Sequence, residues 1–186
     1  MQNLEIKCIY PAHRLAERLA VGEVGALNFG RLKQTDTYFH VSRGRLKLRH
    51  SLHYAPQRDA RPAGCYELIS YRRLDLGAAR PSFYEILAIP DGPKTLRFLS
   101  ACLGVKVRVY KSRKVYLREN LRIHLDTVRG LGRFLEFELL VSRSHPLATC
   151  KKQMSQLLAL FHVSKESLIR FSYSDLLLRG PRDQSP

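Results

Sequence analysis

The sequence predicts an α+β domain in which about eight β-strands close around a shared, solvent-filled lumen, with about three or four helices packed outside. Two observations lead to this fold class. Most predicted strands alternate charged and apolar side chains, so each strand places its charges on one face. The predicted helices carry apolar stripes at helical spacing, which match the apolar strand faces and leave the charged faces to meet each other.

In the first half of the chain, strands are predicted where polar and apolar side chains alternate. A helix is predicted where two leucines lie between a proline and a glycine. The helix, at 11–22, places Leu15 and Leu19 four residues apart. Residues 50–65 contain two prolines and a glycine, and are expected to form a polar loop. Strands are expected at 3–7, 37–41, 44–49, 66–73 and 83–89, the second and third of which form a hairpin.

In the second half, the spacing of the apolar residues changes twice between the pattern of a helix and that of a strand. A helix is predicted at 91–104 from a proline near its start and leucines at helical spacing. Strands are expected at 105–117 and 121–128 and, after a turn, within 129–141. From residue 146 a helical stripe follows, made of Leu147, Cys150, Met154, Leu157, Leu158 and Phe161. Ser164 is predicted to cap a last short helix at 165–171.

The length and the net charge of the chain limit the number of domains and the kind of partner. The chain has 186 residues, which suits one domain with a substantial core. Its 32 Lys and Arg residues outnumber its 16 Asp and Glu residues, for a formal net charge of +16. This excess predicts an anionic partner: a polyphosphate, a nucleic acid or an acidic lipid surface. We expect one domain over residues 1–178 and a disordered tail over 179–186.

The cysteines and the N-terminus indicate a compartment. Cys8, Cys65, Cys102 and Cys150 have neither CxxC spacing nor the density of a small secreted framework, so we expect free, buried thiols in a reducing compartment. The N-terminus lacks a signal-peptide profile, and no apolar run reaches the roughly 18 residues of a membrane helix. The prediction is a cytoplasmic protein without a membrane partner.

Charges of one sign gather on single strand faces. The shared faces carry Arg45, Lys47 and Arg49; Lys111 and Arg113; Arg122, His124 and Asp126; and Glu136 and Glu138. Any one of these strands could belong to a sheet with one face in water. Together they surround a lumen in which unrelieved repulsion between the cations would be strong. A polyanionic ligand with metal ions would relieve that repulsion, which points to phosphate chemistry. The sequence contains neither a GxxxxGK[ST] phosphate loop nor a Cys/His zinc pattern.

Five segments in this order resemble the CYTH family, the triphosphate tunnel metalloenzymes, and the resemblance runs from residue 3 to about 178. "NLEIK" resembles the family's opening ExExK motif. The other four, "QTDTYFHVSRGRLKLR", "KSRKVYL", "RIHLDTVRGLGRFLEFE" and "SYSDLL", resemble the class IV adenylyl cyclase-like subgroup. The family also includes thiamine triphosphatases and inorganic triphosphatases.

The resemblance implies a closed antiparallel eight-stranded β-barrel, the triphosphate tunnel, with flanking helices. It implies that basic strands bind a triphosphate and that carboxylates hold Mg²⁺ or Mn²⁺. The catalytic positions of ExExK would be Glu5 and Lys7. The phosphate-binding residues would be Arg45, Lys47, Arg49, Arg72, Lys111 and Arg113, and the metal ligands Glu5, Asp126, Glu136 and Glu138.

The sequence departs from the family pattern at several acidic positions. Asn3 replaces the first Glu of ExExK, and Glu85 stands where relatives often have an acidic pair. Thr127 and Arg129 occupy a turn that is often acidic in relatives. Each change makes the expected site more positive. Asn3 would either offer a metal ion its carbonyl oxygen or serve only as a hydrogen-bonding residue.

The residues leave the reaction open. A bound triphosphate would give cyclic AMP and pyrophosphate if the ribose 3′-oxygen attacks the α-phosphorus of ATP, and orthophosphate if water attacks the terminal phosphorus. The first reaction is expected, with an inorganic triphosphatase or thiamine triphosphatase as the alternative. A non-catalytic polyphosphate, nucleotide or RNA-binding module is a further alternative, and a homodimer is compatible with the sequence. Nucleic acid is less favoured, because aromatic residues do not interleave with the basic strands. His124 is either a proton shuttle or structural.

Overall fold

The computed structural model describes residues 2–56, 61–73 and 82–180, without the side chains of Gln2, 71–73 and 82–84. The strands are β1 (Gln2–Ile9), β2 (Leu27–Phe39), β3 (Arg45–Tyr54), β4 (Ala63–Arg73), β5 (Ser82–Ile89), β6 (Val105–Arg118), β7 (Leu121–Val128) and β8 (Gly132–Val141). The helices are α1 (His13–Arg18), α2 (Gly92–Leu103), α3 (Leu147–Leu160) and α4 (Tyr173–Arg179), with a π-helical turn η1 (Leu19–Glu23) and a 3₁₀ turn η2 (Lys165–Ser167). Of the predicted tail, Arg179 belongs to α4 and 181–186 lie outside the described residues.

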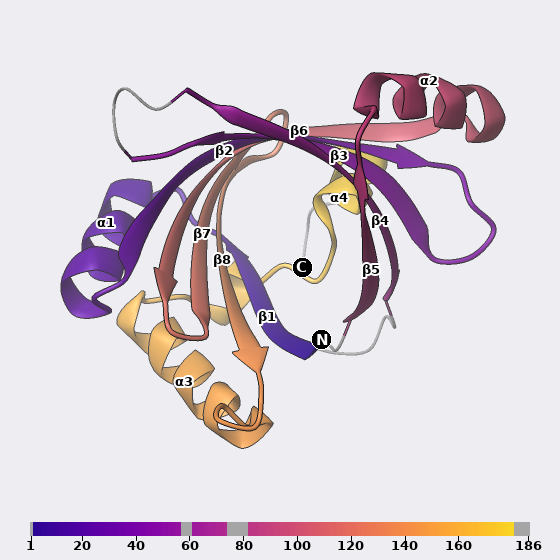
Figure 1. The fold of residues 1–186 in the computed structure, drawn as a ribbon. Helices are drawn as coiled ribbons and strands as arrows, with labels where there is room; N and C mark the ends of the chain where they lie inside the picture. The colour runs from indigo at the N-terminus through magenta and orange to yellow at the C-terminus, as the bar shows by residue number, and fades with distance from the viewer. Residues whose placement is uncertain (1, 57–60, 74–81, 181–186) are drawn as a thin grey trace.

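All eight strands form one antiparallel sheet in the order β1-β8-β7-β6-β2-β3-β4-β5. The sheet curls around a central space, so that its edge strands β1 and β5 approach each other on the side away from β2 and β6 (Figure 1). Within the described residues, β1 pairs only with β8 among the strands, and β5 only with β4. The predicted α+β architecture is therefore present, but a closed barrel is not confirmed.

The free edge of β1 is used by a segment from the C-terminal part of the chain. The backbone N–H of Ile169 donates to the carbonyl oxygen of Lys7 at 2.8 Å, and Leu168 forms an isolated antiparallel bridge with Cys8. This segment leads the chain from α3, outside the sheet, to α4 on its concave side (Figure 1). Alternation predicts which face a side chain takes, but it does not predict which backbone pairs with an edge strand.

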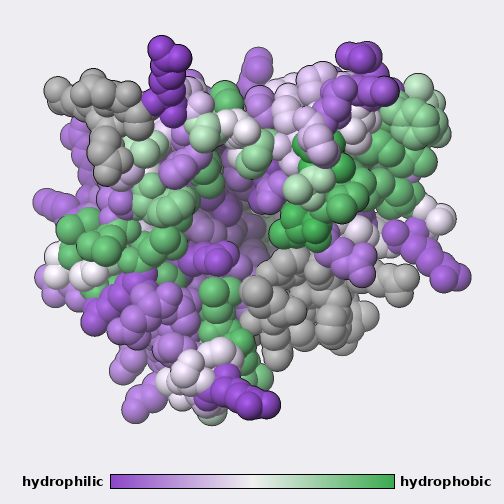
Figure 2. Space-filling view, in the orientation of Figure 1, coloured by the Kyte–Doolittle hydropathy of each residue, from purple (hydrophilic) through white to green (hydrophobic). Residues whose placement is uncertain are grey.

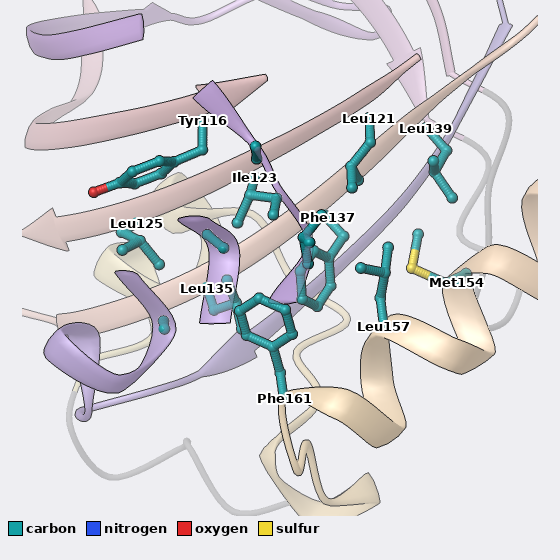
Figure 3. Close-up of a cluster of buried hydrophobic side chains, with 14 of the residues drawn as sticks. Tyr116, Leu121, Ile123, Leu125, Leu135, Phe137, Leu139, Met154, Leu157 and Phe161 are labelled. Atoms are coloured by element: carbon teal, nitrogen blue, oxygen red, sulfur yellow. The ribbon is translucent and has the colours of Figure 1, made fainter. Parts of the chain in front are cut away.

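The main core lies on the convex side of the sheet, beneath α1 and α3. Buried apolar side chains of β7 and β8 pack against α3, as Figure 3 shows. Of the predicted α3 stripe, Cys150, Met154, Leu157 and Phe161 are buried, whereas Leu147 is 38 % exposed at the helix start. The buried members from the two strands are Leu121, Ile123, Leu125, Leu135, Phe137 and Leu139. The predicted apolar faces of these strands are thus confirmed.

Several predicted boundaries were wrong. β2 begins at Leu27 rather than at 37, and β3 continues to Tyr54, into the predicted loop. The two strands pair from Phe39 and Leu46 back to Arg31 and Tyr54, so backbone hydrogen bonding extends this hairpin beyond its alternating residues. Residues 57–60 of that loop lie outside the described part of the chain.

The C-terminal helix is also placed differently. The predicted helix at 165–171 is only the turn η2 followed by extended chain, and the Ser164 side chain makes no capping bond there. Instead, Ser172 caps α4 in a capping box with Asp175: each residue's side chain accepts from the other's backbone N–H. The prediction missed this helix because α4 is only seven residues long.

The four cysteines are free, as predicted. Cys8 and Cys150 are buried, but the expectation of burial was wrong for Cys65 and Cys102, which are exposed. Cys102 lies on α2, where the leucines of the predicted stripe are only partly buried and Cys102 is exposed. Among the described helices, none combines the length and apolarity that crossing a membrane requires.

The convex core should dominate stability. Phe137 is 1 % exposed and packs edge-on against Phe161 at 4.9 Å between ring centroids. We expect Phe137→Ala to lower the free energy of unfolding by about 3–5 kcal/mol, because it removes buried apolar contacts and leaves a cavity. Phe98→Ala on α2, where the ring is 66 % exposed, is the control and should cost less than about 0.5 kcal/mol. Chemical denaturation measures both, and equal effects would contradict this placement of the core.

Candidate functional site

The charged strand faces meet on the concave side of the sheet. On β7, Ile123 and Leu125 enter the convex core, so the alternate residues His124 and Asp126 point to the concave side. The cross-strand register then places Glu136 beside His124, and Arg113 beside Asp126. Figure 2 shows a hollow at the centre of one face of the molecule, with hydrophilic residues within it.

Asp36 joins two cations from β3 on this concave face. Its carboxylate accepts two hydrogen bonds from Arg49, from Nε at 2.7 Å and from Nη2 at 2.9 Å. It also accepts one from Lys47 Nζ at 3.0 Å. Burial alone would raise the pKa of the Asp36 carboxyl, but Lys47 and Arg49 outweigh it and hold this pKa well below its usual range.

Asp126 holds Arg113 in the same way. The carboxylate accepts from Arg113 Nε at 2.7 Å and from Nη2 at 2.6 Å. The hydroxyl of Tyr173, from α4, donates to the same carboxylate at 2.9 Å. Burial opposes ionisation, but Arg113 and Lys111 lower the pKa of Asp126 to about 2. Asp126 is fully buried, and its carboxylate is already bonded to an arginine and a tyrosine.

Glu136 is the centre of a third group. Its carboxylate lies 2.9 Å from Lys7 Nζ, 3.3 Å from Arg113 Nη2 and 3.0 Å from His124 Nδ1. The Lys7 ammonium also lies over the Tyr173 ring, 4.4 Å from its centroid. Burial would lower the pKa of Lys7, but Glu136 and Glu5 raise it above its usual value. Lys7 is therefore a permanent cation in this site.

Lys111 differs from the other cations. It is buried, and within the described residues its ammonium forms no ion pair; it lies 5.6 Å from the centroid of the Tyr173 ring. Burial and the neighbouring charge of Arg113 lower the pKa of Lys111 to about 7. Burial and Arg49 likewise lower the pKa of Lys47 to about 8, against the attraction of Asp36.

Glu5 and Glu138 lie opposite each other on β1 and β8. The Glu138 carboxylate accepts from Asn3 Nδ2 at 2.6 Å and lies 3.5 Å from Arg122 Nη1. The side chains of Glu5 and Glu138 are 31 % and 13 % exposed, so they can be reached from the lumen. Across the described residues, no three Asp, Glu, His or Cys side chains gather closely enough to hold a metal by themselves. A carboxylate pair does fit Mg²⁺, which takes one or two carboxylates together with substrate phosphates.

One end of the concave side is filled by α4. A small second core joins Tyr173 and Leu176 to apolar side chains of the sheet, among them Val109, Val128 and Phe134. Arg45 is tied to the start of this helix, through Nη1 to Ser172 Oγ at 2.7 Å and Nη2 to Asp175 Oδ2 at 2.9 Å. The structure therefore places Arg45 at the filled end of the lumen, against α4.

The predicted site residues thus fall into groups. Lys47 and Arg49 of β3 and Lys111 and Arg113 of β6 line one wall, on the two strands that flank β2. Lys7 lies with Glu5 and Glu136 on β1 and β8. Arg72 pairs through its backbone with Phe83, and its side chain lies outside the described residues. Sequence reasoning missed Asp36, Gln34 and Tyr173. The alternation of Gln34, Asp36 and Tyr38 could have shown the first two, had the predicted strand not begun at Thr37.

Comparison with known proteins identifies the family. The CYTH domain profile matches residues 1–173. A curated relative from Methanocaldococcus jannaschii, named "Putative adenylate cyclase", is 34% identical over 68 residues, which are 37% of this chain and 39% of that protein. The match therefore spans well under half of that relative's length.

Solved structures show the same fold. A Pyrococcus horikoshii OT3 protein superposes with a TM-score of 0.74 at 20% identity, over 95% of this chain and 99% of that one. A Hippeastrum protein superposes with a TM-score of 0.61 at 15% identity over 99% of both chains; it is described as a "Putative adenylyl cyclase" with a dominant triphosphatase activity. At these identities the likeness concerns the fold alone. Since the family profile covers nearly the whole chain, the chain belongs to the CYTH family.

Proposed function

We propose that this chain is a divalent-metal-dependent enzyme that acts on a triphosphate bound against the concave wall. The observation that carries the proposal is a set of four cations on that wall: Lys47, Lys111 and Arg113 are buried, and Arg49 is half-buried. Burying a cation costs several kcal/mol unless an anion compensates it. Two of the four have a bidentate carboxylate, but Lys111 forms no ion pair among the described residues and is stabilised by Asp126 and Asp36 only at longer range. A triphosphate would supply the missing negative charge.

The two arginines are preorganised for this ligand. Asp36 and Asp126 bond the Nε and Nη2 atoms of Arg49 and Arg113, which leaves Nη1 of each guanidinium to donate to a phosphate oxygen. Donors that are already fixed need no reorganisation as charge develops on the phosphate. Asp126 and Glu136 were expected to bind metal. We propose instead that these two carboxylates orient Arg113 and Lys7.

Family membership implies a divalent cation, and the carboxylates of Glu5 and Glu138 are its proposed ligands. Both face a lumen that would contain the phosphates, and neither is enclosed by cations as Glu136 is. Mg²⁺ or Mn²⁺ held there would neutralise phosphate charge. Lys7 keeps its proton because its pKa is raised, so its catalytic role is that of a fixed positive charge beside the substrate.

The reaction we favour is conversion of ATP to cyclic AMP and pyrophosphate. The name of the archaeal relative supports it. The alternative is hydrolysis of an inorganic or thiamine triphosphate, which the description of the Hippeastrum protein supports. The same phosphate contacts serve both reactions, since phosphoryl and nucleotidyl transfer depend mainly on positioning and on charge neutralisation.

Product identification tests the proposal. ATP, tripolyphosphate and thiamine triphosphate are each incubated with the protein and Mg²⁺ or Mn²⁺, and all products are separated and identified. We expect cyclic AMP and pyrophosphate from ATP, and turnover only with added metal. Orthophosphate as the main product would favour the hydrolase. No turnover of any of the three would contradict an enzyme, and salt-sensitive binding of RNA alone would then favour a binding module.

The metal assignment predicts a selective defect in Glu138→Gln. The metal concentration needed for half-maximal rate should rise roughly 10-fold or more, because a neutral amide is a weaker ligand than a carboxylate. Glu17→Gln is the matched control: Glu17 pairs with Lys114 at 2.6 Å, on the convex side. Metal titrations of the rate compare the two variants, and thermal unfolding verifies the fold. An unchanged metal requirement in Glu138→Gln would remove Glu138 from the site.

Triphosphate binding should be coupled to proton uptake. In the free protein the pKa of Lys111 is about 7, and bound phosphate would raise it by stabilising the charged form. Near about pH 8 the binding of tripolyphosphate should therefore take up a proton, and affinity should fall as the pH rises above about 7. Calorimetric titration in buffers of different ionisation enthalpy measures the uptake.

Two variants test which residue takes up the proton when tripolyphosphate binds. Lys111→Met should lose a large part of the uptake, with Lys47, whose pKa is about 8, supplying the remainder. Lys114→Met, on the convex side, should behave as the wild type. Affinity that does not change with pH in the wild type would show that Lys111 lies away from the phosphates.

A further inference from the structure

Gln34 has a buried polar atom without a partner. It lies on β2 and is 6 % exposed, and its Nε2 donates to Ser51 Oγ on β3 at 3.0 Å. Its Oε1 is buried and meets no hydrogen-bond donor among the described residues. A buried acceptor without a donor costs about 1–3 kcal/mol. A position that retains such a cost is a candidate for contact with a ligand.

The register places this amide in the cationic wall. Gln34 lies directly opposite Lys111 of β6 on one side and Ser51 of β3 on the other. Arg113 stands two residues along β6 and Arg49 two residues along β3, so both are diagonal neighbours. Direct and diagonal neighbours lie about 4.5–8 Å apart. A phosphate held by these cations would therefore lie next to the Gln34 side chain.

The chemistry of an amide oxygen limits what it can contact there. It accepts hydrogen bonds, and ionised phosphate oxygens also only accept, so Oε1 cannot bind them. It needs an O–H or N–H group next to the phosphate. In both reactions of the proposed function, the group that must lie beside the reacting phosphorus is a hydroxyl: the ribose 3′-hydroxyl or a water molecule.

We propose that Gln34 Oε1 accepts a hydrogen bond from the attacking hydroxyl and aims its oxygen at the phosphorus; this rests on the proposed function. Ser51 is a positioning residue, because it holds the amide by accepting from Nε2. In the cyclase reaction the 3′-oxygen forms a bond to the α-phosphorus, and the bond from that phosphorus to the bridging oxygen breaks.

The electron pair of the broken bond stays on the pyrophosphate, and the proton of the hydroxyl passes to this pyrophosphate or to solvent. In hydrolysis the water oxygen forms the same kind of bond to the terminal phosphorus, whose bond to the bridging oxygen breaks. That electron pair stays on the diphosphate product, and a proton of the water passes to that product or to solvent. The amide takes no proton in either case, so its contribution is orientation alone.

The test is Gln34→Met, which keeps the length of the side chain but removes its hydrogen bonding. With whichever triphosphate the wild type turns over, kcat should fall about 10²-fold, because the hydroxyl loses its orientation. KM, and Kd for a non-hydrolysable triphosphate analogue, should stay within about twofold, since the phosphate-binding cations remain. Ser51→Ala should lower kcat by a smaller factor, again with KM unchanged. Gln156→Met, at an exposed position of α3, is the matched control.

The effects of Gln34→Met on kcat and on KM distinguish a role in orienting the hydroxyl from a role in binding phosphate. A rise in KM and Kd with kcat intact would overturn the proposal, because the amide would then bind phosphate through its NH₂ group. Wild-type kinetics in Gln34→Met would overturn it as well. Binding of the analogue is measured without turnover, so a fully inactive wild type would be recognised separately: it would refute the proposed function, and the role of Gln34 with it. Thermal unfolding of both variants verifies that they fold.

Discussion

The arrangement of the lumen depends on two bidentate ion pairs with buried carboxylates: Asp36 with Arg49, and Asp126 with Arg113. A buried charge costs several kcal/mol unless its hydrogen bonds are satisfied, and each carboxylate bonds two nitrogens of its arginine. Because the partners stand opposite each other in the register of adjacent strands, the sheet itself fixes the direction of both guanidinium groups. The other charges of the lumen are arranged around these pairs.

The C-terminal helix links this electrostatic arrangement to the packing. Tyr173 packs into the small core at one end of the lumen and donates its hydroxyl to Asp126. Its ring also lies under the ammonium groups of Lys7 and Lys111. α4 reaches this place because Leu168 and Ile169 pair with the edge of β1. The same contacts that occupy that edge therefore also complete one end of the site.

Alternation in the sequence predicted the faces of β1, β3, β7 and β8 well, because a strand with one apolar and one charged face has a strict period of two. It was not followed far enough on β2, where the strand was expected to begin at 37 although Gln34, Asp36 and Tyr38 continue the alternation. Asp36 was therefore left outside the expected site. Closure of the sheet and the position of α4 depend on contacts between residues distant in sequence, which no local pattern contains. The ion pairs of Asp126 and Glu136 are of this kind as well, so a local pattern could not separate a metal ligand from a partner of an arginine.

Binding of a triphosphate to the cationic wall of the lumen can be observed directly. The most direct measurement is a crystal structure of the protein soaked with a non-hydrolysable triphosphate. We expect phosphate density on the concave side, in contact with Arg49, Lys111 and Arg113, with the ion pairs of Asp36 and Asp126 still intact. Phosphate bound only outside the lumen would contradict this placement.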